Sequence, residues 1–153
     1  MSGVWARSQG VSICATEHLD VEAKPTLRQA LADGIERGFE GKLPSLPENA
    51  ECYRLRANSA DVGALVLIPA YPTLNDVTLF ALVIDSEWRG NAFATKALLA
   101  TERRLLREGK KRLVARVPRT NGRGLYFMLR AGFTPMIDAS PNDATWFIRG
   151  GAS

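Results

Sequence analysis

The stretch from Leu82 to Thr95 has the residue types of an anion-binding turn. An apolar run ends at Ile84, and residues 89–95 read Arg-Gly-Asn-Ala-Phe-Ala-Thr at the start of an expected helix. Free amides at a helix start bind phosphate oxygens, and small residues let the backbone approach such a ligand. Arg89 adds a fixed positive charge. An ordinary strand-to-helix connection with a solvated arginine fits this pattern equally well, so both interpretations stay open at this point.

Several other chemistries are excluded by the residue inventory. His18 is the single histidine, so a multi-histidine metal site cannot be built, and we predict no metal. The sequence holds no GxSxG nucleophile elbow, no GxxxxGK[ST] phosphate loop and no GxGxxG after a strand. Cys14 and Cys52 lack CxxC spacing and fall in strand-like segments, which favours buried free thiols.

The elements that must position the turn follow from hydrophobic periodicity. The pattern predicts a mixed sheet of seven strands, at residues 11–18, 51–56, 62–68, 76–84, 113–117, 133–138 and 145–149. It predicts helices around 27–39 and at 92–108 and 121–131. The inner stripe expected for the second helix is Ala94, Ala97, Leu98, Thr101, Leu105 and Leu106.

The wholly apolar run 79–84 places its strand centrally in the sheet, and the last two strands form an expected hairpin. The fold class is therefore α+β, with a mixed α/β sheet, in a single domain spanning residues 1–153. The composition, 46% hydrophobic and 24% charged, is that of a soluble globular protein. With no apolar run of about 20 residues and no signal-like N-terminus, we expect no membrane association and a cytoplasmic location.

Charge is divided unevenly along the chain. Residues 1–88 carry a net −5 and residues 89–153 a net +9, which points to an anionic partner for the second half. Nine basic residues lie between Arg103 and Arg123. A nucleic-acid footprint, the surround of a polyanionic cofactor and a solvated face are the three interpretations. Nucleic acid is the weakest of them, because no aromatic residues are interleaved and no binding motif is present.

Two motifs, in this order and at this spacing, resemble those of the GNAT superfamily of N-acetyltransferases. The first is the family's [Q/R]-x-x-G-x-[G/A] turn, here Arg89-Gly-Asn-Ala92-Phe-Ala94, in which Ala92 replaces a glycine. The second is the family's helix block, in which Asn121, Gly132 and Phe133 have the usual spacing. The element order resembles the family over residues 10–149.

The resemblance implies acetyl-CoA as the acyl donor. Its pyrophosphate would lie on the amides of residues 89–95, and its pantetheine arm would run along residues 82–84 as an added strand. The fold implied is a GNAT-like, mostly antiparallel sheet of about seven strands flanked by helices, with the fourth and fifth strands splayed apart. The cofactor-contacting residues implied are Leu82, Val83, Ile84, Arg89, Gly90, Asn91, Ala92, Phe93, Ala94, Thr95, Asn121 and Arg130.

The catalytic residues depart from the family pattern. Met128 stands where the family often has the tyrosine that protonates the departing thiolate, and methionine cannot donate a proton. Tyr126 is a candidate acid, but it lies about 200° away around a helix. A core or surface aromatic is its favoured interpretation.

A base is equally hard to assign. Thr78 holds the strand position at which some family members have a glutamate, so Asp76, on the same face of the strand, is the candidate general base. A turn residue is the favoured interpretation of Asp76. Glu40 and Glu51 are further candidates without a spacing argument.

The sequence thus predicts an acetyl-CoA-dependent N-acetyltransferase. Acetyl would pass directly to a primary amine of a small molecule, peptide or protein in a ternary complex. The alternative is a catalytically weak or inactive acyl-CoA-binding or regulatory module of the same fold. A homodimer is left open.

Overall fold

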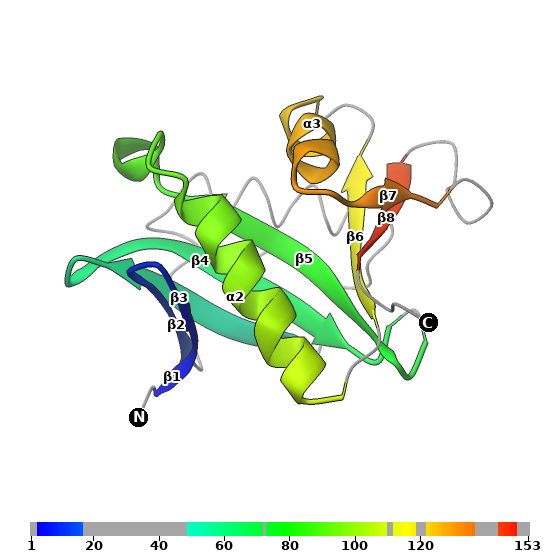
Figure 1. Cartoon of the computed structure of the whole chain (residues 1–153), viewed down its shortest axis with the longest axis horizontal. Helices are drawn as coiled ribbons and strands as arrows, with labels where there is room; N and C mark the ends of the chain where they lie inside the picture. Colours follow the sequence, from blue (N-terminus) through cyan, green and yellow to red (C-terminus); the bar gives the residue numbers. More distant parts are fainter. Residues whose placement is uncertain are drawn as a thin grey trace.

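Eight strands form one sheet in the order β1-β2-β3-β4-β5-β6-β8-β7 (Figure 1). The computed structural model describes residues 3–16, 49–71, 73–109, 112–118, 122–136 and 144–149. The strands are β1 (Val4–Ser8), β2 (Val11–Thr16), β3 (Glu51–Ala57), β4 (Ala60–Pro69), β5 (Asp76–Ile84), β6 (Arg112–Pro118), β7 (Thr134–Pro135) and β8 (Ala144–Arg149). The helices are the short 3₁₀ helix η1 (Ser86–Trp88), α2 (Phe93–Arg107) and α3 (Gly122–Arg130). The helix expected around residues 27–39 lies outside the described residues.

The sheet is mixed, as predicted from the sequence. Strands β1 to β5 form an antiparallel meander, β5 pairs with β6 in parallel, and β6, β8 and β7 are again antiparallel. The parallel step places α2 between β5 and β6 in the chain, as a crossover connection requires. The expected hairpin of the last two strands corresponds to the β7–β8 pair.

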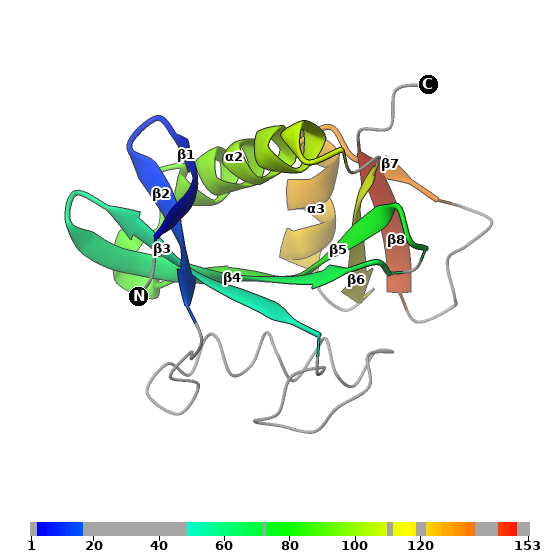
Figure 2. The ribbon, with the colours of Figure 1, turned by 90° about the horizontal axis from the view of Figure 1, so that it is seen from below.

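Both described α-helices lie on the same side of the sheet (Figure 2). The buried face of α2 consists of Phe93, Ala97, Leu98, Ala100, Thr101 and Leu105, which recur at helical spacing. This face packs with the inward side chains of the strands, among them Ile13, Leu55, Leu79 and Phe147, in one core. Burying these side chains stabilises the fold by roughly 1.5–3 kcal/mol for each large one.

Strand β1 was not predicted from the sequence. It turns into β2 through Gln9 and Gly10, both of which have positive φ, the geometry of a two-residue hairpin turn. The ring of Trp5 lies 4.7 Å from that of Tyr53, and Arg104 of α2 donates to the Trp5 carbonyl at 3.0 Å. The glycine of this turn is the local signal that could have indicated the strand, and the contacts with Tyr53 and Arg104 come from residues distant in the chain.

Two further predictions need correction. Leu106, predicted on the inner stripe of α2, is 54% exposed, because it follows the buried Leu105 by about 100° around the helix. Strand β7 is limited to Thr134–Pro135, shorter than the predicted 133–138. Pro135 has no amide hydrogen to donate, which suits this short outermost strand.

Cys14 is buried and Cys52 is half-buried, and both are free thiols. Burial raises the pKa of the Cys52 thiol above its usual value. None of the helices described here is sufficiently long and apolar to cross a bilayer.

Candidate acyl-CoA site

The turn between β5 and α2 is tight and internally bonded. Helix η1 follows β5, and Gly90 then takes φ 88° and Ala92 φ 59°, both in the left-handed region. The side-chain amide of Asn91 donates to the Trp88 carbonyl at 3.0 Å, which fixes the turn from inside. The turn therefore presents backbone, rather than long side chains, at the start of α2.

The N-terminus of α2 has no side-chain cap. Ala92 is the N-cap residue, and the first turn contains no acidic side chain. Because the first amides of a helix have no partner within the helix, this end carries a partial positive charge that remains available to an anion. Phosphate binding at this turn stays a prediction, and the start of α2 presents backbone amides of the kind it requires.

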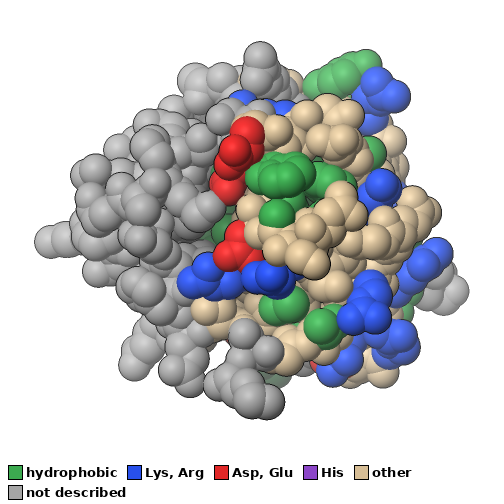
Figure 3. Space-filling model, turned by 90° about the vertical axis from the view of Figure 1, so that its left-hand side faces the viewer, with side chains coloured by type: hydrophobic (Ala, Val, Ile, Leu, Met, Phe, Trp, Pro, Cys, Tyr) green, Lys and Arg blue, Asp and Glu red, His purple; other side chains and the backbone are tan. Residues whose placement is uncertain are grey.

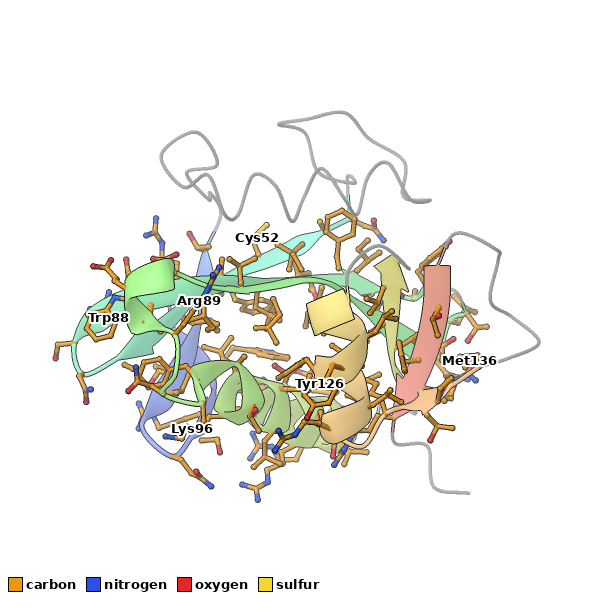
Figure 4. All side chains as sticks on the ribbon, turned by 90° about the horizontal axis from the view of Figure 1, so that it is seen from above. Cys52, Trp88, Arg89, Lys96, Tyr126 and Met136 are labelled. Atoms are coloured by element: carbon orange, nitrogen blue, oxygen red, sulfur yellow. The ribbon has the colours of Figure 1, made fainter. Side chains whose placement is uncertain are left out.

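Two cations lie beside this turn. Arg89 is exposed, and its Nε donates to the Ile84 carbonyl at 3.1 Å, so the guanidinium stays near the end of β5. Lys96 was not identified from the sequence; its Nζ lies 5.7 Å from the centre of the Phe93 ring. Lys96 lies one turn into the helix after Ala92, and this position is the sequence signal that could have identified it as a second cation beside the turn. Figure 4 shows Trp88, Arg89 and Lys96 at the same end of the molecule.

Strands β5 and β6 separate beside the turn. Their parallel pairing runs from Asp76–Arg112 to Leu79–Ala115 and goes no further within the described residues. From there β6 continues along β8, while β5 continues along β4 to the pair Gly63–Ile84. Leu82, Val83 and Ile84 therefore lie on the part of β5 that has left β6, and the predicted splay is confirmed.

A β-bulge occurs in β5 where the splay starts. Val66 pairs with Ala81 and Leu67 with Leu79, so Phe80 is the extra residue. A bulge bends its strand and increases its twist. It therefore helps β5 to turn away from β6 at this level.

Helix α3 places Met128 and Tyr126 on opposite sides. Met128 is 6% exposed and belongs to the core, while Tyr126 is 62% exposed. Arg130 donates to the Tyr126 hydroxyl at 3.4 Å and lies 5.5 Å from its ring centre. Figure 4 shows Tyr126 and Lys96 on the helix side of the sheet and Cys52 on the other side. Of the two interpretations favoured for Tyr126, a core or a surface aromatic, its exposure fits the second, and its role as an acid stays a prediction.

The base candidates have varied surroundings. Asp76 is fully buried at the paired start of β5, and its carboxylate accepts hydrogen bonds from Arg112 and Thr73. Glu51 begins β3 with an exposed side chain. Glu40 and the predicted pantetheine ligand Asn121 lie outside the described residues. The partners of Asp76 favour a structural role, and its role as a base stays a prediction.

Basic side chains are prominent on part of the surface. Figure 3 shows several Lys and Arg side chains spread along one side of the face it presents, with acidic groups toward the middle.

In the chain segments that the structure covers, no group of three or more His, Cys, Asp and Glu side chains is arranged to hold a metal ion.

Solved structures share this arrangement of strands and helices. An acetyltransferase from Thermus thermophilus has a TM-score of 0.66 at 20% identity, covering 94% of this chain and 99% of its own. A GNAT family acetyltransferase from Elizabethkingia anophelis, with acetyl-CoA bound, has a TM-score of 0.64 at 13% identity, covering 94% of this chain and 99% of its own. This chain has the GNAT fold.

A Bacillus subtilis acetyltransferase in complex with CoA has a TM-score of 0.63 at 13% identity, covering 95% of this chain and 98% of its own. Comparison of the sequence with protein-family models and with curated proteins finds no match. The GNAT fold is thus established by the three-dimensional arrangement, at sequence identities of 20% and 13%.

Proposed function

We propose that the protein is an acetyl-CoA-dependent N-acetyltransferase that transfers acetyl directly to a primary amine. One observation carries this proposal. The part of β5 that no longer pairs with β6 leads through a short turn into α2, whose N-terminus has no side-chain cap. A strand edge binds an extended amide chain, and a helix start binds phosphate. Acetyl-CoA has both groups, joined in one molecule.

Each part of the cofactor then has a counterpart in the chain. The amides of residues 89–95, with Arg89 and Lys96, would hold the pyrophosphate. Residues 82–84 would pair with the pantetheine amides, and Arg130 and Asn121 would contact the cofactor from the other side of the splay. The Elizabethkingia and Bacillus proteins named above, with acetyl-CoA and CoA bound, support this assignment.

The proposed reaction needs few special side chains. The neutral amine nitrogen attacks the thioester carbonyl, the C–N bond forms, and the C–S bond then breaks to release CoA thiolate. The amine nitrogen loses one proton to water, and the CoA thiolate takes one proton from water, so the products are the amide and the free CoA thiol. Placement beside the acetyl group would supply much of the acceleration. The acceptor is a primary amine of a small molecule, a peptide or a protein.

Calorimetric titration with CoA tests the binding part of the proposal. Ala94→Glu places a negative charge and extra bulk in the first turn of α2, and we expect it to weaken CoA binding by about tenfold or more. Leu106→Glu is the matched control, because it adds the same charge at an exposed position near the other end of the helix. Equal affinities of the two variants would show that the turn is not the site.

Thiol release from acetyl-CoA in the presence of a panel of amines tests the catalytic part. Amine-dependent release above the background of hydrolysis is the expected result. A second candidate is a non-catalytic acyl-CoA-binding module, which the buried Met128 favours because the usual acid is missing from that position. CoA binding without release with any amine would support this second candidate over the first.

A further inference from the structure

Arg149, at the end of β8, contacts both of the helices α2 and α3. Its guanidinium forms an ion pair with Glu102 of α2, and it also donates to the carbonyl of Ala131, the residue after α3. It lies 6.0 Å from the centre of the Phe133 ring. The Arg149 side chain is 32% exposed and that of Glu102 is 18% exposed, so water screens this pair only in part.

The contact with Ala131 comes at a defined helix end. The Phe133 amide donates to the Met128 carbonyl at 3.0 Å, and the Gly132 amide donates to the Leu129 carbonyl at 3.1 Å. These two bonds form the Schellman motif, which needs a left-handed residue, here Gly132 with φ 92°. Carbonyls at a helix C-terminus carry partial negative charge, which a guanidinium stabilises.

Gly132 also leaves room for the arginine. A Cβ at this position would overlap Nη1 of Arg149. Gly109, which ends α2 with φ 80°, would meet nothing within 4 Å if it carried a Cβ. The two glycines thus share the need for positive φ, and Gly132 alone of this pair has a second constraint from Arg149.

The register of the sheet places Arg149 at the closed end of the splay. Arg149 pairs with Leu113 of β6, and Leu113 pairs with Val77 of β5, within the region where β5 and β6 are still joined. The buried Phe147, two residues earlier, lies on the same face of β8 as Arg149. The guanidinium therefore contacts both helices at a level where β5 and β6 are still paired, two residues before their last pair, Leu79–Ala115.

We propose that Arg149 is a positioning residue that fixes α3 relative to α2 and so sets the opening in which acyl-CoA binds. This inference rests on the proposed function. Helix α2 presents the phosphate turn and α3 carries Arg130, so the distance between them determines whether one cofactor molecule can contact both. One planar guanidinium can hold a carboxylate on one helix and a carbonyl on the other at the same time.

The test measures CoA affinity by calorimetry together with the melting temperature and the steady-state constants. In Arg149→Gln, we expect the Kd for CoA and the KM for acetyl-CoA to rise roughly three- to tenfold, with kcat changed less than about twofold. Glu102→Gln removes the same ion pair by changing its acidic partner, so it should also raise the Kd for CoA and the KM for acetyl-CoA. Arg149→Lys keeps the charge without the fork, so its Kd should be intermediate.

The glycine pair supplies the matched control. Gly132→Ala and Gly109→Ala both strain a positive-φ residue, and we expect the first alone to weaken CoA binding, because it also displaces Arg149. Variants that melt earlier but bind CoA as the wild type does would overturn the positioning role and leave the proposed function intact. A wild-type protein that binds no CoA would instead overturn the proposed function, and this inference with it.

Discussion

The carboxylate of Asp76 and the guanidinium of Arg112 form a two-pronged ion pair at the paired end of β5 and β6. Arg112 Nε lies 2.6 Å from Oδ1 and Nη2 lies 2.8 Å from Oδ2. The Thr73 hydroxyl donates to Oδ2 at 2.9 Å, which ties the preceding loop to the same carboxylate. The pair therefore joins β5 and β6 at the first of their paired positions, and the strands diverge only after the last, Leu79–Ala115.

Replacing Asp76 by Asn should lower stability and leave catalysis nearly unchanged. The change leaves the Arg112 guanidinium without its anion in a partly buried place, at a cost of roughly 2–4 kcal/mol. Urea unfolding gives the stability, and kcat measured well below the melting temperature gives the activity. A fall in kcat of about 100-fold or more in a folded Asp76→Asn variant would instead assign Asp76 as the general base.

The same carboxylate makes stability depend on acid pH. Burial by itself raises the pKa of Asp76, but the hydrogen bonds from Arg112 and Thr73 outweigh it and hold the pKa below its usual value. The stabilisation is present above the unfolded-state pKa of about 3.9 and is lost as the pH falls through the lower folded-state pKa. Between pH 5 and pH 2.5, the free energy of unfolding should fall more steeply in the wild type than in Asp76→Asn. Parallel curves would contradict this prediction.

Replacing Ala92 by Gly should stabilise the protein. Ala92 has φ 59° and ψ 23°, a left-handed conformation that costs an L-residue with a Cβ roughly 1–2 kcal/mol. After the larger entropy loss of glycine, a net gain of about 0.5–1 kcal/mol remains, which raises the melting temperature by about 2–4 °C. Ala94→Gly, inside the helix, should have the opposite sign. Equal destabilisation by both changes would rule out strain at Ala92.

Replacing Gly63 by Ala should disrupt the β4–β5 pair. A Cβ on Gly63 would overlap the backbone carbonyl oxygen of Val83, which cannot move away as a flexible side chain would. We expect a loss of about 3 kcal/mol or failure to fold, measured by thermal unfolding and soluble yield. Gly122→Ala is the control, because a Cβ there meets nothing within 4 Å. A Gly63→Ala variant as stable as this control would contradict the close approach of the two strands.

Replacing Tyr126 by Phe should leave turnover within about twofold of the wild type. The Tyr126 residue is 62% exposed, and among the described residues its hydroxyl makes one long contact, of 3.4 Å, with the exposed Arg130, so removing the hydroxyl takes no partner from a buried group there. The measurement is kcat with acetyl-CoA saturating across a pH series. A loss of about 100-fold in kcat at unchanged KM would identify Tyr126 as the acid that protonates the thiolate.

The unit that runs from β5 through the turn to α2 could be predicted from local sequence patterns. Its signals are local: an apolar run up to Ile84, small residues around Ala92, and a glycine at 109 that ends the helix. These features act through backbone conformation and periodicity over a few residues, so they can be read without knowledge of the rest of the fold. The mixed sheet could be predicted in the same way, because local patterns assign the strands and helices and their order in the chain indicates the sheet type.

The contacts between groups from distant segments could not be predicted in this way and follow from how the elements pack. Asp76 meets Arg112, 36 residues away in the chain, and Arg104 of α2 donates to the Trp5 carbonyl of β1. The link from Arg149 to Glu102 and Ala131 likewise depends on how three elements pack. Such contacts are set by packing across the whole core. Hydrophobic periodicity predicts which face of a helix or strand is buried, but it does not predict which residues that face contacts.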